Sequence, residues 1–162
     1  MPNGRSLLSR LLLAGLVTGV IDGSFASVQS LFNGSTPERV FQGVASTLLG
    51  PSALDGGART AAIGVLMHFG VALGWSAVFL LLYESLPRLR SLVQSPLGPL
   101  KVAAVYGPFI WLVMSLVVIP LLVHHPTIIR PRWWVQLIGH IFFVGLPIVT
   151  MVSWRDRSPR PM

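Results

Sequence analysis

Four long apolar runs dominate this chain, and each is long enough to cross a lipid bilayer as a helix. The runs cover about residues 11–32, 60–84, 100–123 and 133–154. Charged residues make up only 10% of the sequence and mean hydropathy is +0.71, whereas about a quarter of a typical soluble domain is charged. The sequence therefore predicts an all-α fold in which residues 1–162 form a single integral membrane domain, a four-helix bundle.

The first apolar run carries small residues along one side of its helix. Gly15, Gly19 and Gly23 recur every four residues and so form one glycine stripe at 3.6 residues per turn. Small residues let another helix approach closely in lipid, where packing and hydrogen bonds drive association. Asp22 lies on the same side and therefore points at protein. An acid inside a span costs roughly 2.5–3.5 kcal/mol on insertion scales, so we interpret it as functional and expect a partner on another helix.

The same run also resembles a secretory signal peptide. Arg5 and Arg10 precede it, and Ser24-Phe25-Ala26 offers a small-x-small cleavage site. Apolar character continues past this site to residue 32, and the series of small residues continues with it. We therefore expect a retained helix, with cleavage near residue 26 as the alternative.

A shorter helix is predicted between the first two runs, over about residues 37–49. Thr36 is a good N-cap, Pro37 suits the first helical position, and Gly50-Pro51 ends the pattern. Apolar residues recur at helical spacing on one side, and the segment is too short to span a membrane. We expect an amphipathic interfacial helix that lies over the bundle; a small helix packed on the helix ends is the alternative.

The later runs contain further small residues and several prolines. Gly64 shares a face with His68 in the second run, where Gly70 and Gly74 offer another close-packing surface. Prolines and glycines predict irregular helices, with a kink in the third run and a bend in the fourth. These positions are Gly107-Pro108, Pro120, Gly145 and Pro147.

Basic residues are distributed unequally between the two ends of the predicted spans. Four spans place both termini on one side, and that side collects 8 of the 12 Lys and Arg residues. The eight are Arg5, Arg10, Arg88, Arg90, Lys101, Arg155, Arg157 and Arg160; the other side holds Arg39, Arg59, Arg130 and Arg132. The positive-inside rule then favours a multi-pass protein of the bacterial inner (plasma) membrane with both termini in the cytoplasm.

In this topology four polar residues converge at one depth. Asp22, His68 and His140 each lie about seven to ten residues from the outer end of their helix, roughly 10–15 Å below the outer surface. Gln136 shares a face with His140, one turn further out. We therefore predict a candidate polar cluster of Asp22, His68, Gln136 and His140. The residues expected close to this layer or at the mouth above it are Ser115, His124 and His125.

Three roles are open for the polar cluster. Hydrogen bonds between Asp22 and a histidine would fix the register of the helices, as polar residues in bundles often do. An Asp–His pair inside a membrane also titrates where histidine switches, which would make the cluster proton-responsive. Alternatively, His68 and His140 would face each other as the axial ligands of a haem.

Other activities are disfavoured by what the sequence lacks. It contains no cysteine, which excludes disulfides, zinc–thiolate sites and iron–sulfur clusters. It also contains no Gly-x-Ser-x-Gly elbow, no His-Glu-x-x-His run and no phosphate-binding loop. We therefore expect no enzyme activity, no catalytic or metal-binding residues, and no cofactor apart from the haem alternative. The expected partner is the lipid bilayer and not nucleic acid. The glycine faces leave open a structural or assembly subunit that docks a second copy or another membrane protein.

Several short motifs follow one another between Gly64 and Arg157. They are His68-Phe69, the exit Tyr83-Glu84-x-x-Pro87-x-x-Arg90, Pro120, a Pro–aromatic loop with Trp133, Gly139-His140, and a basic end at Arg155 and Arg157. In this order they resemble the YagU-type bacterial inner-membrane proteins, over more than half of the chain. The resemblance implies a small multispanning protein of unassigned molecular activity that is linked broadly to acid resistance. This chain departs from the family in its shorter first outer loop and in lacking cysteine.

Overall fold

The computed structural model describes residues 6–154, and within that range the chain is built from helices without any strand. In order these are α1 (Leu7–Phe32), α2 (Pro37–Leu49), the 3-10 helix η1 (Pro51–Asp55), α3 (Gly57–Ser85), α4 (Pro87–Gln94), α5 (Gly98–Val113), the π-helical segment η2 (Met114–Val118), α6 (Ile119–Val123), α7 (Pro131–His140), the π-helical segment η3 (Ile141–Gly145) and α8 (Leu146–Ser153). The predicted all-α fold is confirmed. Arg5 and the basic end from Arg155 to Arg160 lie outside the described residues.

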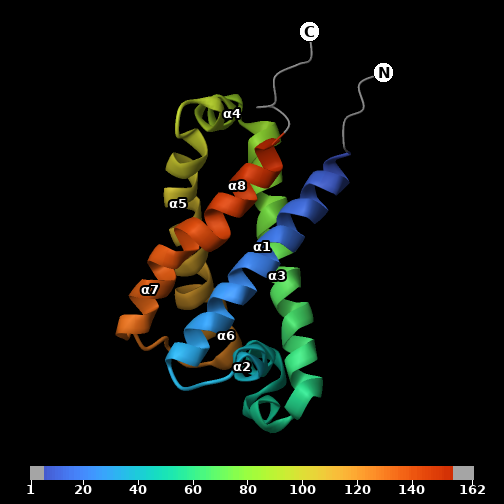
Figure 1. The fold of residues 1–162 in the computed structure, drawn as a ribbon, viewed down its shortest axis with the longest axis vertical. Helices are drawn as coiled ribbons and strands as arrows, with labels where there is room; N and C mark the ends of the chain where they lie inside the picture. The colour runs from blue at the N-terminus through green and yellow to red at the C-terminus, as the bar shows by residue number, and fades with distance from the viewer. Residues whose placement is uncertain (1–5, 155–162) are drawn as a thin grey trace.

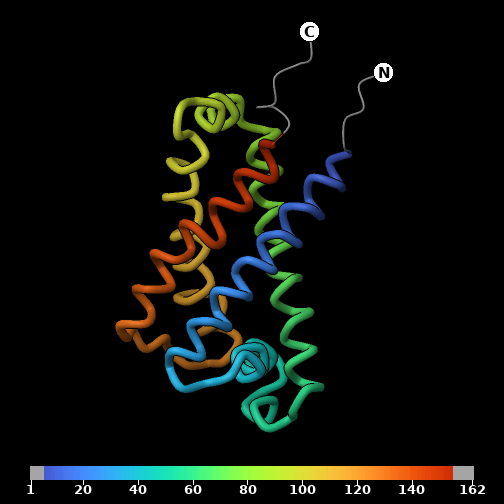
Figure 2. Tube along the Cα trace, in the orientation of Figure 1, coloured from blue at the N-terminus to red at the C-terminus, as the bar shows by residue number. Residues whose placement is uncertain are grey.

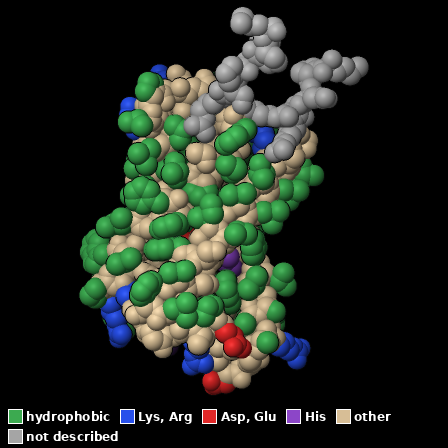
Figure 3. All heavy atoms as spheres, viewed as in Figure 1, with side chains coloured by type: hydrophobic (Ala, Val, Ile, Leu, Met, Phe, Trp, Pro, Cys, Tyr) green, Lys and Arg blue, Asp and Glu red, His purple; other side chains and the backbone are tan. Residues whose placement is uncertain are grey.

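Among residues 6–154, four helical stretches are long and apolar enough to cross a membrane. They are α1, α3, the stretch Gly98–Val123 and the stretch Pro131–Ser153, of 26, 29, 26 and 23 residues. Hydrophobic side chains cover the middle of the molecule, whereas Lys and Arg side chains gather towards its two ends (Figure 3). By length and composition the chain is a multi-pass membrane protein, since so broad an apolar surface matches lipid and not water.

Helix α1 contacts two of the other three spans. It packs along α3 and against α8, while α7, η3 and α8 pack in turn along α5 (Figure 1). Between α3 and α5 the contact is made by large side chains: the Trp75 and Tyr106 rings lie 6.3 Å apart, and the Tyr106 hydroxyl donates to the Trp75 carbonyl at 2.7 Å. The contacts of α1 make the second and fourth spans its neighbours. The lengths of the loops did not determine this arrangement of the helices.

Helix α2 lies across one end of the bundle. Figure 2 shows it nearly end-on, between the lower ends of α1, α3 and α6. The Thr36 side chain caps it by accepting a hydrogen bond from the Arg39 backbone N–H at 3.2 Å. A Cβ at Gly64 would overlap with the carbonyl oxygen of Phe41, so this glycine is what lets α2 lie directly on α3.

The third and fourth spans also approach each other backbone to backbone. A Cβ at Gly107 would overlap with the carbonyl oxygen of His140, and one at Gly145 would lie 2.8 Å from the carbonyl oxygen of Ala103. Glycines that the sequence marked as sites of bending are therefore also the contact points between two helices. They fix the position of His140 relative to α5.

Both of these spans contain an irregular, π-helical stretch. Helix α5 continues through Pro108 to Val113, and the π-helical segments follow later, at η2 and η3. Each ends two residues before a proline, Pro120 or Pro147. A proline supplies no N–H and its ring crowds the carbonyl four residues earlier, which a widened turn relieves.

An ionic cluster ties together the end of the bundle that carries α4. Arg10 Nη1 and Arg90 Nη2 bind the two carboxylate oxygens of Glu84 at 2.6 and 2.7 Å. Arg10 also donates to the carbonyl of Val152 through Nε at 2.9 Å, and both guanidinium groups lie over the Tyr83 ring at 5.3–5.4 Å. The cluster joins α1, α3, α4 and α8, and the start of α1 and the end of α8 lie at this same end (Figure 1).

Candidate functional site

The glycine stripe of α1 faces α3 of the same chain. A Cβ at Gly15 would overlap with Leu73, and a Cβ at Gly19 would lie 2.5 Å from the Phe69 ring. A Cβ at Gly23 would lie 3.3 Å from His68 Nε2. The stripe therefore holds the two helices in close contact and brings the His68 ring against α1. By contrast, nothing lies within 4 Å of a Cβ at Gly70 or Gly74, so neither glycine is at a close helix contact.

The predicted partner of Asp22 lies on the facing helix. His68 Nε2 is 4.0 Å from Asp22 Oδ2 and 3.0 Å from the carbonyl oxygen of Gly19. Since a carbonyl can only accept, the Nε2 hydrogen is directed at Gly19 and the Asp22 contact is a close charge-to-ring approach without a hydrogen bond. Both side chains are largely buried, with exposed fractions of 19% for Asp22 and 15% for His68.

The fourth span supplies the other two members of the polar cluster. His140 Nδ1 donates to the carbonyl of Gln136 at 2.8 Å, and the His140 ring packs against Trp111 with centroids 4.8 Å apart. This bond leaves Nε2 of a neutral His140 as an acceptor. The Gln136 amide donates to Gln29 Oε1 at 2.6 Å, a link from α7 to α1 that the sequence pattern did not reveal. Gln29 lies two turns beyond Asp22, which is the spacing that could have indicated it.

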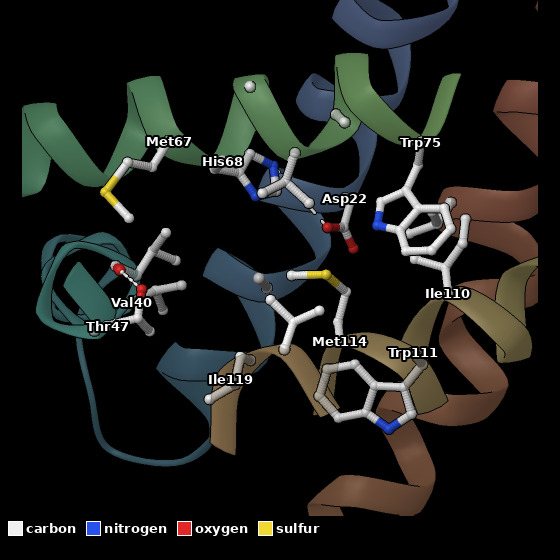
Figure 4. A pocket seen from close by; sticks show the side chains of 18 of the residues that line it. Asp22, Val40, Thr47, Met67, His68, Trp75, Ile110, Trp111, Met114 and Ile119 are labelled. Atoms are coloured by element: carbon white, nitrogen blue, oxygen red, sulfur yellow. Dashed lines mark hydrogen bonds and ion pairs between the residues drawn. The ribbon is translucent and has the colours of Figure 1, made fainter. Parts of the chain in front are cut away.

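All four members of the polar cluster line one cavity of about 690 Å³. Its lining residues come from α1, α2, α3, the third span and the fourth span. Figure 1 shows α2 across the end of the bundle at which α3 and the third span diverge. Figure 4 shows the Asp22 carboxylate projecting into this space from α1, with His68 and Met67 on α3 and Met114 opposite. The remaining lining is almost wholly apolar. A cavity of this size is typical of small-molecule sites, which range over about 300–1,000 Å³.

The three residues expected close to this layer or at the mouth above it are not among those that line the cavity. Ser115 is buried and its hydroxyl accepts a hydrogen bond from Trp133 Nε1 at 3.1 Å, so it joins the third span to the fourth outside the cavity. His124 and His125 are in the connection between α6 and α7 and are not among the residues that line the cavity.

The cluster does not have the arrangement of a metal site. Among residues 6–154 no group of three or more His, Asp or Glu side chains could hold a metal ion. A haem bound through His68 Nε2 would have to break the contact with Gly19, because axial histidines ligate through a ring nitrogen without a hydrogen. What the arrangement offers instead is one carboxylate with two imidazoles in its electrostatic range.

Comparison of the chain with models of protein families, with curated proteins and with solved structures finds no match. The resemblance to the YagU-type proteins therefore stays a prediction, and the site is interpreted from its own geometry.

Proposed function

We propose that this membrane protein is proton-responsive through Asp22, His68 and His140, which bind and release protons as one coupled group. The observation that carries the proposal is the Asp22–His68 pair, with His68 Nε2 4.0 Å from Asp22 Oδ2 inside a cavity between membrane-spanning helices. Ionisable residues at such positions are costly, and their default role is in proton or ion chemistry. Histidine changes charge between about pH 5 and 8, so a cluster that contains two of them can switch in the physiological range.

The cluster lies in the outer half of the membrane in the topology that we propose, a bacterial inner-membrane protein with cytoplasmic termini. Arg10, Arg88, Arg90 and Lys101 lie at the end of the bundle that carries α4, and the cavity lies towards the opposite end. A sensor of acid outside the cell would have its titrating groups in that half. The resemblance to proteins linked to acid resistance supports the same assignment.

The cysteine-free chain allows the orientation to be tested directly. Asp55 is 87% exposed in η1, and Ser91 is exposed in α4 at the other end. In intact cells a membrane-impermeant maleimide should label Asp55→Cys and not Ser91→Cys. The reverse pattern would contradict cytoplasmic termini.

The proton-responsive role and a purely structural role predict different pH behaviour. We would measure the melting temperature of the detergent-purified protein from pH 5 to 8 for the wild type and for His68→Gln/His140→Gln. If the histidines titrate as part of a functional cluster, the wild type changes stability across this range and the double variant does not. A change of about 1 kcal/mol in the free energy of unfolding corresponds to a shift of roughly 2–4 °C in the melting temperature for a chain of this size.

A matched control is the double variant His124→Gln/His125→Gln, which removes the same number of imidazoles from the connection between α6 and α7. It should retain the pH dependence of the wild type. If the cluster only fixes helix register, His68→Gln/His140→Gln lowers the melting temperature by the same amount at every pH. That outcome would reject the proton-responsive function.

A further inference from the structure

The carboxylate of Asp22 has no hydrogen-bond donor among the residues that the structure describes. His68 Nε2, 4.0 Å from Asp22 Oδ2, directs its hydrogen at Gly19. His140 and Gln136 direct theirs at the Gln136 carbonyl and at Gln29. A carboxylate that is removed from bulk water without a donor is unfavourable, so this one is suited to a counter-charge that comes from outside the chain.

Aromatic rings surround the space in front of this carboxylate. Phe41 from α2, Trp75 from α3 and Trp111 from α5 all line the cavity, and in Figure 4 the Asp22 carboxylate lies between His68 and Trp75, with Trp111 on the far side of Met114. The faces of aromatic rings attract cations, and most strongly where the cation is desolvated. One acid among three aromatic residues, in a cavity whose other walls are mostly apolar, favours a positively charged ligand with a large hydrophobic body.

The mouth of the cavity opens towards lipid. Three apolar residues at its edge are exposed: Leu48 of α2 by 61%, Val71 of α3 by 41% and Leu122 of α6 by 43%. Since α3 and α6 belong to candidate membrane spans, a ligand would reach Asp22 sideways from the bilayer. Such a path admits molecules that dissolve in the membrane and excludes small hydrated ions.

We infer that the cavity binds lipophilic cations, with Asp22 as the counter-ion and Phe41, Trp75 and Trp111 as the aromatic wall. This inference rests on the proposed function in one respect: protons and the cation compete for the same cluster. The titratable residues that line the cavity are Asp22 from α1, His68 from α3 and His140 from α7; α2, α5, η2, α6 and η3 contribute none. Protonation of any of the three makes the cavity more positive and disfavours the cation.

Tetraphenylphosphonium and tetraphenylborate provide a matched pair of probes, because they share a shape and differ in the sign of their charge. We would measure the binding of each to the purified protein by equilibrium dialysis at pH 8, with protein-free micelles as the reference. Tetraphenylphosphonium should bind at least tenfold more tightly than tetraphenylborate. Equal affinity for the two ions, or binding of neither, would overturn the inference.

Variants of Asp22 assign the charge preference to this residue. Asp22→Asn should remove the preference for the cation, whereas Asp22→Glu and the distant control Asp55→Asn should retain it. A melting curve for each variant verifies that it is folded. A cation preference that persists in folded Asp22→Asn would overturn the assignment.

The pH dependence separates this inference from the proposed function. Tetraphenylphosphonium should bind at least tenfold more weakly at pH 5.5 than at pH 8. If it binds equally at both, the competition with protons is wrong and the proposed function fails with it. If it does not bind while the histidine-dependent change in melting temperature is present, the lipophilic-cation site is wrong and the proposed function stands.

Discussion

At the scale of single residues, glycines determine where two helices of this fold can approach each other closely. Gly64 is the sharpest case, because the carbonyl of Phe41 occupies the space that a side chain would need. Its spacing from His68 predicted a shared face, but no sequence pattern could reveal that α2 would lie across it. A helical period gives the direction of a side chain, not the identity of the backbone it meets.

Gly64→Ala should therefore be destabilising although alanine is the better helix former. The added Cβ must push α2 away from α3, and overpacking of this kind typically costs about 1–3 kcal/mol. The measurement is the melting temperature in detergent, with Gly74→Ala as the control, since a Cβ at Gly74 meets nothing within 4 Å. Equal melting temperatures for the two variants would contradict the close contact between α2 and α3.

Asp22 illustrates how much a single residue in an apolar run can indicate. Its position predicted a partner on another helix, and the fold brings His68 to 4.0 Å from its carboxylate. Gln29 and Arg10 were not predicted as links to the fourth span. Both bind groups more than 100 positions away, namely Gln136 and the Val152 carbonyl, and such pairings depend on the order of helices in the bundle.

At the scale of elements, the sequence located the four long apolar helices and α2, because hydrophobic length and capping residues are local signals, but it did not predict α4 or η1. Thr36 and Pro37 start α2 where their chemistry favours a helix start. The prolines were less informative. Helix α5 accommodates Pro108, whereas the widened turns of η2 and η3 precede Pro120 and Pro147. Whether a proline ends, kinks or widens a helix depends on how the neighbouring helices satisfy the freed carbonyl, which is a tertiary property.

At the scale of the whole molecule, the cavity is a consequence of bundle geometry. α3 and α5 are linked by the aromatic pair Trp75 and Tyr106 and diverge beyond it, so that α2 covers the opening at the end. Depth along each helix could be counted from the sequence, and the cavity does collect Asp22, His68 and His140. Other features of the cavity depend on the arrangement of all four spans and could not be predicted from the sequence. They are its volume, its mouth between α2, α3 and α6, and the lack of a hydrogen-bond donor to Asp22.

The proposed function requires that three residues from three spans titrate as one group. The decisive experiment follows the pH dependence of the histidine ring ¹⁵N resonances from pH 5 to 8 in the wild type and in Asp22→Asn. We expect His68 and His140 both to titrate and both curves to move when the acid is removed, while those of His124 and His125 do not. Titration curves of His68 and His140 that are unchanged in Asp22→Asn would contradict the coupling.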